Sequence, residues 1–170
     1  RRASPQWRAL ACDLAAVLEA RDPMRGEARR SDDLRIRVHA LNAWRRGGQR
    51  DQVDRNLMSS IDQAARQWRR RLRIESEVSG DIGSHDVGAL LAFAYPDRIA
   101  RQDPANPRRY QMANGRGAQL LHESALFGSP WIVIAEIRFD ERDSLIQRAA
   151  PIGLDDLEKQ FPEQFQTLRT

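Results

Sequence analysis

The stretch that decides the fold is DVGALLAFAYPDRIAR at residues 86–101, followed by RYQMANGRGA at 109–118 and QLLHESAL at 119–126. Its first segment predicts an amphipathic helix that Ser84 caps and that reaches Tyr95, because the proline that follows cannot continue a helix. After this proline the apolar period falls towards two, and turns rich in Arg, Asn and Gly separate the apolar runs. The stretch therefore predicts one helix that leads into short strands.

Five segments beyond this helix are candidate strands, because they are short, apolar and separated by Pro, Gly, Asn and Asp. They are residues 98–101, 110–113, 118–121, 131–139 and 144–149. The run WIVIA, which opens the fourth segment, is continuously apolar, as expected for a strand buried on both faces. Pro151 is expected to end the sheet, and residues 154–160 are expected to form a short terminal helix. Five short strands beside a helix predict a small barrel of the OB type.

The first 75 residues predict a bundle of three amphipathic helices, since apolar residues recur there at helical spacing. Ser4 caps the first helix, the second begins at Ser31, and Asp51 caps the third. Three tryptophans fall on the apolar faces and are expected in the core: Trp7, Trp44 and Trp68. The fold class predicted is α+β in two domains. Residues 1–78 form the helical bundle, and residues 79–170 form the OB-like barrel with its flanking helix and a short C-terminal helix.

Composition indicates soluble globular material, with 41% hydrophobic and 31% charged residues among 170. No run approaches the roughly 20 apolar residues that a membrane span requires, and the first residues do not have the apolar h-region expected of a signal peptide. The single cysteine, Cys12, excludes an internal disulfide. We therefore expect a cytoplasmic protein without a membrane partner.

The basic residues are almost all arginine, since Lys159 is the one lysine among 28. The planar guanidinium matches phosphate and stacks on bases, which favours nucleic acid as a partner, although a GC-rich genome produces the same bias without functional meaning. Residues 1–75 carry 18 basic and 10 acidic side chains, a net charge of +8, and residues 76–170 carry 10 and 14, a net charge of −4. Any electrostatic attraction of nucleic acid is therefore expected to be stronger in the first half.

The motifs of common catalytic sites are missing from the sequence. No GxxxxGK[ST] phosphate loop and no DEAH or DEAD box occurs, so hydrolysis of a nucleotide by the P-loop route is not expected within this chain. His39, His85 and His122 lie far apart without zinc-ligand spacing, and Ser124 lacks the glycines of a nucleophile elbow. We expect no catalytic residue and no metal site.

Two arginine-containing segments permit both a structural and a functional interpretation. Residues 114–117, Asn-Gly-Arg-Gly, are typical of a hairpin turn, and the same turn would offer Arg116 and bare backbone N–H groups to a phosphate. Residues 69–71 end the third predicted helix, where three arginines match the helix dipole or form a phosphate patch. Both interpretations stay open for each segment.

Several motifs resemble one family in the order in which they occur. YPDRIA, ANGRGA, HESAL and WIVIAEI resemble the OB-fold region of DEAH-type ATP-dependent helicases, specifically their bacterial HrpB branch. ACDLAAVLEARDPMRG, at residues 11–26, resembles the helical ratchet domain that follows the two RecA-like domains in that family. One departure is Glu123, which stands in HESAL where the family's HPSSAL segment has a proline.

The resemblance implies an accessory, nucleic-acid-binding region of a helicase. Members of the family move along single-stranded nucleic acid while RecA-like domains hydrolyse ATP. ATP and magnesium are therefore expected for the intact parent and no cofactor for this fragment. The partners implied are single-stranded nucleic acid, with RNA favoured over DNA, and the RecA-like domains; the sequence does not decide between RNA and DNA. The strand contacts implied by position are Arg98, Arg101, Asn114, Arg116, His122 and Ser124. Arg70 and Arg71, at the end of the third predicted helix, are further candidates.

A second function of a different class stays open. OB folds in this setting also dock proteins, so the chain is alternatively a protein-interaction module that binds a partner or the RecA-like domains without touching a strand. Exposed apolar patches together with no affinity for single strands would favour this alternative.

Overall fold

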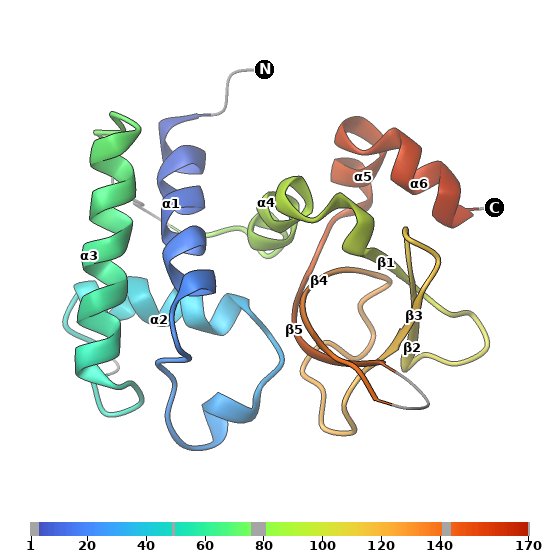
Figure 1. The fold of residues 1–170 in the computed structure, drawn as a ribbon, viewed down its shortest axis with the longest axis horizontal. Helices are drawn as coiled ribbons and strands as arrows, with labels where there is room; N and C mark the ends of the chain where they lie inside the picture. The colour runs from blue at the N-terminus through green and yellow to red at the C-terminus, as the bar shows by residue number, and fades with distance from the viewer. Residues whose placement is uncertain (1–3, 49, 76–80, 141–143, 170) are drawn as a thin grey trace. The chain divides into compact units, whose positions relative to one another are not determined.

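The computed structural model describes residues 4–48, 50–75, 81–140 and 144–169. The chain forms two compact units (Figure 1). The helical unit comprises Arg1–Arg30 and Arg35–Ile82, and the barrel unit comprises Ser31–Leu34 and Gly83–Thr170. The domain boundary predicted between residues 78 and 79 lies outside the described residues.

The helical unit contains α1 (Pro5–Glu19), the 3-10 helix η1 (Gly26–Arg30), α2 (Arg35–Arg45) and α3 (Arg55–Arg71), with α1 and α3 side by side (Figure 1). Ser4 caps α1 as predicted, since its side chain accepts a hydrogen bond from the N–H of Trp7. The prediction that Asp51 caps the third helix is wrong. Asp54 does so, because it directly precedes the helix and accepts the N–H of Leu57 at 3.0 Å.

The second helix begins at Arg35 rather than at Ser31. Residues 31–34 instead pair with the last strand of the barrel. The N–H of Leu34 donates to the carbonyl of Ala149, and the N–H of Ala149 donates to the carbonyl of Asp32, both at 2.9 Å. This segment thereby belongs to the barrel unit, although it lies between two helices of the other unit in the sequence.

A buried ion-pair network joins the helices of the helical unit. Asp13 on α1 is fully buried and accepts two hydrogen bonds from Arg45 of α2, at 2.8 and 2.9 Å, and one from Arg69 of α3 at 3.3 Å. Asp62 of α3 accepts from Arg45 at 2.7 Å and from Arg66 at 3.0 Å. Burial would lower the pKa of Arg45, but its bonds to the two carboxylates raise that pKa above the ordinary value.

The tryptophans of the helical unit are half-buried, so their predicted place in the core is wrong for all three: Trp7, Trp44 and Trp68. Trp68 packs at the edge of a small cluster of Ala9, Cys12 and Ile74. The buried apolar side chains of α1 and α3 are aliphatic or small, among them Leu14, Met58 and Ile61, and the tryptophan rings lie at the margin. Cys12 is buried, and its burial raises the pKa of its thiol.

The barrel unit contains the five predicted strands, with limits shifted by one or two residues. They are β1 (Ile99–Gln102), β2 (Arg109–Met112), β3 (Gly117–Gln119), β4 (Trp131–Arg138) and β5 (Ser144–Pro151). The strands close in the order β1-β2-β3-β5-β4, with β3 and β5 parallel and the other pairs antiparallel. The predicted α+β class with an OB-like barrel is confirmed.

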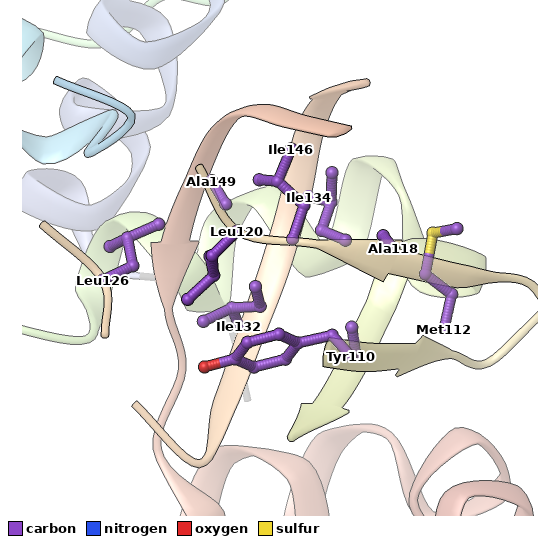
Figure 2. Packing of buried hydrophobic residues seen from close by; sticks show 10 residues of the cluster. Tyr110, Met112, Ala118, Leu120, Leu126, Ile132, Ile134, Ile146 and Ala149 are labelled. Atoms are coloured by element: carbon purple, nitrogen blue, oxygen red, sulfur yellow. The ribbon is translucent and has the colours of Figure 1, made fainter. Parts of the chain in front are cut away.

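All five strands contribute side chains to the core of the barrel, and the alternation of buried and exposed residues is clearest in β2. In β2 the side chains of Tyr110 and Met112 are buried, and those of Arg109 and Gln111 are exposed. Figure 2 shows Tyr110 and Met112 among the aliphatic side chains of the neighbouring strands. The hydroxyl of Tyr110 donates to the carbonyl of Ser129 at 2.5 Å, and burial raises the pKa of Tyr110 to about 12.

Helix α4 (Asp86–Ala94) and the 3-10 helix η2 (Pro96–Arg98) precede the barrel. The helix ends at Tyr95 as predicted, but its N-cap position is His85 and not Ser84. Its backbone packs directly on β5, since a Cβ atom added to Gly88 would lie 1.9 Å from the carbonyl oxygen of Pro151. A glycine is therefore required at this crossing.

Two helices end the barrel unit. Helix α5 (Leu154–Gln160) has the predicted limits, whereas α6 (Pro162–Arg169) was not predicted. The ring of Phe165 on α6 lies 5.5 Å from that of Trp131 on β4, so α6 covers part of the outer surface of the barrel. Within the described residues, no helix has the length and apolar character needed to cross a membrane.

Candidate nucleic-acid interface

The outer surface of β1, β2 and β3 carries the cationic side chains of the candidate interface. Arg101 on β1 pairs with Gln111 on β2, and the neighbouring pair, Ala100 with Met112, is buried. Because successive side chains of a strand point to opposite faces, Gln111, which is exposed, and Arg101, which is half-buried, point away from the core. We call the outward positions of β1–β3 and the adjoining turn at 113–116 the outer face.

Arg109 belongs to the outer face and was missed in the sequence analysis. It is exposed and pairs across the ladder with Gln119 of β3. A Cβ atom on Gly117 would lie 3.8 Å from Nη2 of Arg109, so the guanidinium reaches over β3. The period-2 pattern of RYQM, which places Arg109 on the same face as Gln111, was the signal that could have identified it.

The Asn-Gly-Arg-Gly segment forms the predicted hairpin turn between β2 and β3. Gly115 has φ +85°, and the side-chain oxygen of Asn114 accepts the N–H of Arg116 at 3.0 Å. The N–H of Gly115 donates to the carbonyl of Met112, and the N–H of Asn114 donates to that of Asp97. The backbone N–H groups of residues 114–116 are therefore not bare, and this part of the functional interpretation is wrong.

The side chain of Arg116 remains available in this turn. It is exposed, and among the described residues its guanidinium has no hydrogen-bond or ion-pair partner. A cation on an exposed turn beside two strands can approach a phosphate without first breaking a contact within the protein.

Arg98 lies beside this turn and is held by the fold. Its Nη1 donates to the carbonyl of Ala135 on β4 at 2.8 Å, and its guanidinium lies 5.2 Å from the ring centre of Tyr95. The side chain is half-buried. Arg98 thus ties η2 to β4 and contributes its charge at the margin of the outer face.

The HESAL segment positions Ser124 for a structural bond. Its Oγ donates to the buried carboxylate of Asp32 and accepts the N–H of Leu126 at 3.0 Å. The second oxygen of Asp32 accepts the N–H of Ala125 at 3.0 Å. The hydroxyl of Ser124 is therefore occupied by Asp32, whose segment pairs with β5.

His122 and Glu123 of the same segment are exposed. The carbonyls of Leu121 and His122 accept hydrogen bonds from Nη1 of Arg108 at 3.0 and 2.9 Å. The guanidinium of Arg108 also lies 5.2 Å from the ring centre of Phe127, which is 54% exposed. This arginine–aromatic pair, also missed in the sequence analysis, lies at the end of β2 opposite the hairpin turn.

Arg70 and Arg71 belong to the helical unit. Both are exposed at the end of α3, and the guanidinium of Arg71 lies 5.7 Å from the ring centre of Trp68. Arg69 also belongs to α3, but it is buried and forms an ion pair with Asp13 of α1, so it is not part of a surface patch. The structure thus separates the three arginines into one structural and two exposed residues.

The described residues contain no group of three or more His, Cys, Asp or Glu side chains that could hold a metal ion. The three histidines, His39, His85 and His122, are all exposed. The chemistry available on the outer face is accordingly that of arginine and amide side chains, which bind anions and nucleotide groups.

Comparisons with known proteins identify chains that are similar to this one. No protein-family model matches the chain. Among curated proteins, the ATP-dependent RNA helicase HrpB of Escherichia coli (strain K12) is 32% identical over 103 residues, which are 59% of this chain and 12% of the helicase.

Two solved structures agree with this similarity. The E. coli DExH-box NTPase HrpB matches 91% of this chain at 29% identity with a TM-score of 0.64, and the match covers 16% of that protein. The E. coli DEAH/RHA helicase HrpB matches 86% at 24% identity with a TM-score of 0.62, again over 16% of its length, and supports the fold. The resemblance to the HrpB helicases predicted from the sequence is confirmed, and the chain spans about one seventh of the length of these relatives.

Proposed function

From its similarity to one part of the HrpB helicases, we propose that this chain is an accessory region of an ATP-dependent helicase that binds single-stranded nucleic acid. The observation that carries the proposal is the set of outward cations on neighbouring strands of an OB-like barrel. Arg101, Arg109 and Arg116 come from β1, β2 and the β2–β3 turn.

The outer face has the chemistry that a strand requires. Guanidinium groups bind phosphate oxygens through charge-assisted hydrogen bonds that do not depend on the base. OB folds bind oligonucleotides on the face formed by their second and third strands, and here Arg109 and Gln111 point outward from that face. A helicase that moves along a strand needs contacts of this sequence-independent kind.

The proposed contacts are not equal. Arg116 has an uncommitted guanidinium, whereas Arg98 is tied to β4 and the hydroxyl of Ser124 to Asp32. We assign the phosphate contacts mainly to Arg101, Arg109 and Arg116, because they lie on the outer face or its turn, with His122 and Asn114 at the margin. Glu123 beside His122 adds a negative charge that disfavours a phosphate there.

ATP hydrolysis is assigned to other domains of a longer protein. RecA-like domains would bind ATP with magnesium, while this region holds the strand and contacts those domains. RNA is the first choice of strand, because the similar curated protein is named an RNA helicase. A cytoplasmic location belongs to the same proposal.

Fluorescence anisotropy with labelled single-stranded RNA at low salt tests this function. Replacing Arg101, Arg109 and Arg116 together with glutamine is expected to weaken binding at least about tenfold and to lower the slope of log K against log salt by about 2. The matched control replaces three exposed arginines outside the outer face, Arg21, Arg30 and Arg138, with glutamine. It removes the same charge and is expected to leave most of the affinity.

The proposal fails if both triple variants bind equally, because the effect would then be one of net charge. It also fails if the unmodified chain has no affinity for RNA or DNA strands at low salt. In that case retention of isolated RecA-like domains of the same protein would favour the protein-interaction alternative. A parallel measurement with DNA of the same sequence tests the choice of RNA.

A further inference from the structure

The helical unit contains two adjoining cavities that no motif in the sequence indicated. Their volumes are about 400 and 340 Å³, and Arg50 and Arg55 line both. The first is also lined by Arg25, Asp51, Val53, Asp54 and Asn56. The second is also lined by Trp44, Arg45, Asp62 and Arg66. Because the two cavities share residues, we treat them as one groove beside the start of α3.

The groove is basic even after its own carboxylates are taken into account. Five arginines and three aspartates line it. Asp62 is paired with Arg45 and Arg66, and Asp54 is paired with Arg25 at 3.5 Å. Asp51 is the remaining carboxylate of the lining.

Arg50 and Arg55 carry the excess charge of the groove. Both are exposed, and within the described part of the chain neither has a hydrogen-bond or ion-pair partner. Two guanidinium groups that line the same hollow without an ion-pair partner repel each other, and an anion placed between them removes that repulsion. The arrangement therefore fits a ligand with negative charge.

An aromatic side chain lies in the same groove. Trp44 is half-buried and lines the second cavity together with both free arginines. The next residue, Arg45, is fixed by Asp13 and Asp62, so the end of α2 is held in place before any ligand arrives. An indole beside guanidinium groups provides a surface for a base next to the groups that bind phosphate.

We propose that this groove is a second nucleic-acid subsite, in which Arg50 and Arg55 bind the phosphates of a single strand and Trp44 contacts a base. A free phosphate ion would use the arginines but not the indole, whereas a nucleotide of a strand uses both. The inference takes its class of ligand from the proposed function, but it places binding on the helical unit and not on the outer face of the barrel.

Anisotropy with a fluorescein-labelled oligouridylate measures the subsite in the whole chain. Arg50→Gln with Arg55→Gln is expected to lower the affinity about tenfold and the slope of log K against log salt by about 1.4. Arg21→Gln with Arg46→Gln removes the same charge from exposed positions that line neither cavity, and it is expected to change the affinity less than threefold.

Trp44 is tested by two substitutions, because a half-buried ring also contributes to stability. Trp44→Leu retains apolar volume but no aromatic face, and it is expected to weaken binding at least about fivefold. Trp44→Phe retains an aromatic face and is expected to keep most of the affinity. An unchanged thermal midpoint of the arginine variants shows that any loss of affinity is not a loss of folding.

Comparison with the outer-face variant separates the two proposals. If the outer-face triple variant loses affinity and the Arg50/Arg55 variant does not, the second subsite is refuted while the proposed function stands. The reverse result supports the subsite and refutes the outer face. Equal loss of affinity in the Arg50/Arg55 variant and in its charge-matched control also overturns the subsite. So does a result in which inorganic phosphate binds in the groove but the substitutions leave RNA binding unchanged.

Discussion

Replacing Gly88 with alanine is expected to destabilise the barrel unit strongly. The new Cβ would lie 1.9 Å from the carbonyl oxygen of Pro151 and 2.6 Å from its carbonyl carbon, whereas real Cβ contacts essentially never fall below 3.0 Å. The obstacle is backbone of β5, which pairs with β4 in the barrel wall, so it cannot move aside as a flexible side chain can. Helix α4 must therefore shift away from β5 by more than about 1 Å, which opens the interface that buries Val87 and Leu91.

The size of the effect follows from this geometry. Overpacking of a core costs about 1–3 kcal/mol, and a rigid backbone obstacle places Gly88→Ala at about 3 kcal/mol. For a domain of this size such a loss lowers the thermal midpoint by more than about 10 °C. Thermal unfolding followed by circular dichroism, together with urea titration, measures both quantities.

Gly117→Ala is the matched control for this substitution. It places the same methyl group in a strand of the same barrel, where the new Cβ would meet its first neighbouring atom at 3.8 Å. We expect a change within about 0.5 kcal/mol for this variant. If Gly88→Ala and Gly117→Ala have the same midpoint, α4 does not pack on β5 as described, and the reasoning is refuted.

Three further predictions concern buried polar groups. Asp13→Ala leaves Arg45 and Arg69 without the buried carboxylate that both contact. It is expected to lower the free energy of unfolding, measured by urea titration, by about 3–5 kcal/mol. A loss below about 1 kcal/mol would contradict the network. Asp32→Ala removes the acceptor of two hydrogen bonds within the barrel unit. It is expected to lower the free energy of unfolding by about 2 kcal/mol and to increase hydrogen exchange at the amide of Ala125. Unchanged exchange at this amide would contradict the prediction. Burial raises the pKa of Tyr110 in the folded state to about 12, above the ordinary value of about 10. Between these two pH values the folded state retains a proton that the unfolded state loses. The free energy of unfolding is therefore expected to fall as the pH rises from about 10 to 12. Tyr110→Phe is expected to remove this pH dependence, and persistence of the same slope in the variant would refute the assignment.

Local patterns in the sequence were sufficient for most of the secondary structure. The alternation in Arg109–Met112 and the apolar run at the start of β4 predicted strands, because period and residue type are properties of short segments. The order of five short strands then favoured the OB-like barrel. Helix α5 was predicted with its observed limits for the same reason.

Features that depend on distant parts of the chain were not predicted. Ser31–Leu34 has the local appearance of a helix start, but its backbone pairs with Ala149, more than 100 residues away in sequence. Asp13 and Arg69 look like surface charges until the helices bring them together. Tertiary pairing overrides local preference in both cases.

The candidate site was predicted only in part. Arg101 and Arg116 were selected from the resemblance to the helicase family and lie on the outer face or its turn. Arg109 was missed although the alternation in RYQM places it on the same face as Gln111, and only its pairing with Gln119 depends on the register between β2 and β3. The groove at Arg50 and Arg55 required the relative placement of α2 and α3, which no spacing in the sequence encodes.

The most direct test of the central claim is an NMR titration of the isotope-labelled chain with single-stranded RNA at low salt. We predict that the backbone amides of Arg101, Gln111 and Gly117, and the side-chain amide of Gln111, shift in a saturable manner. Amides of the inward-facing core, such as those of Ile132 and Ile146, are expected to shift little. Saturable shifts that leave the outer face unchanged, or no shifts at all, would contradict the proposal that this barrel binds the strand.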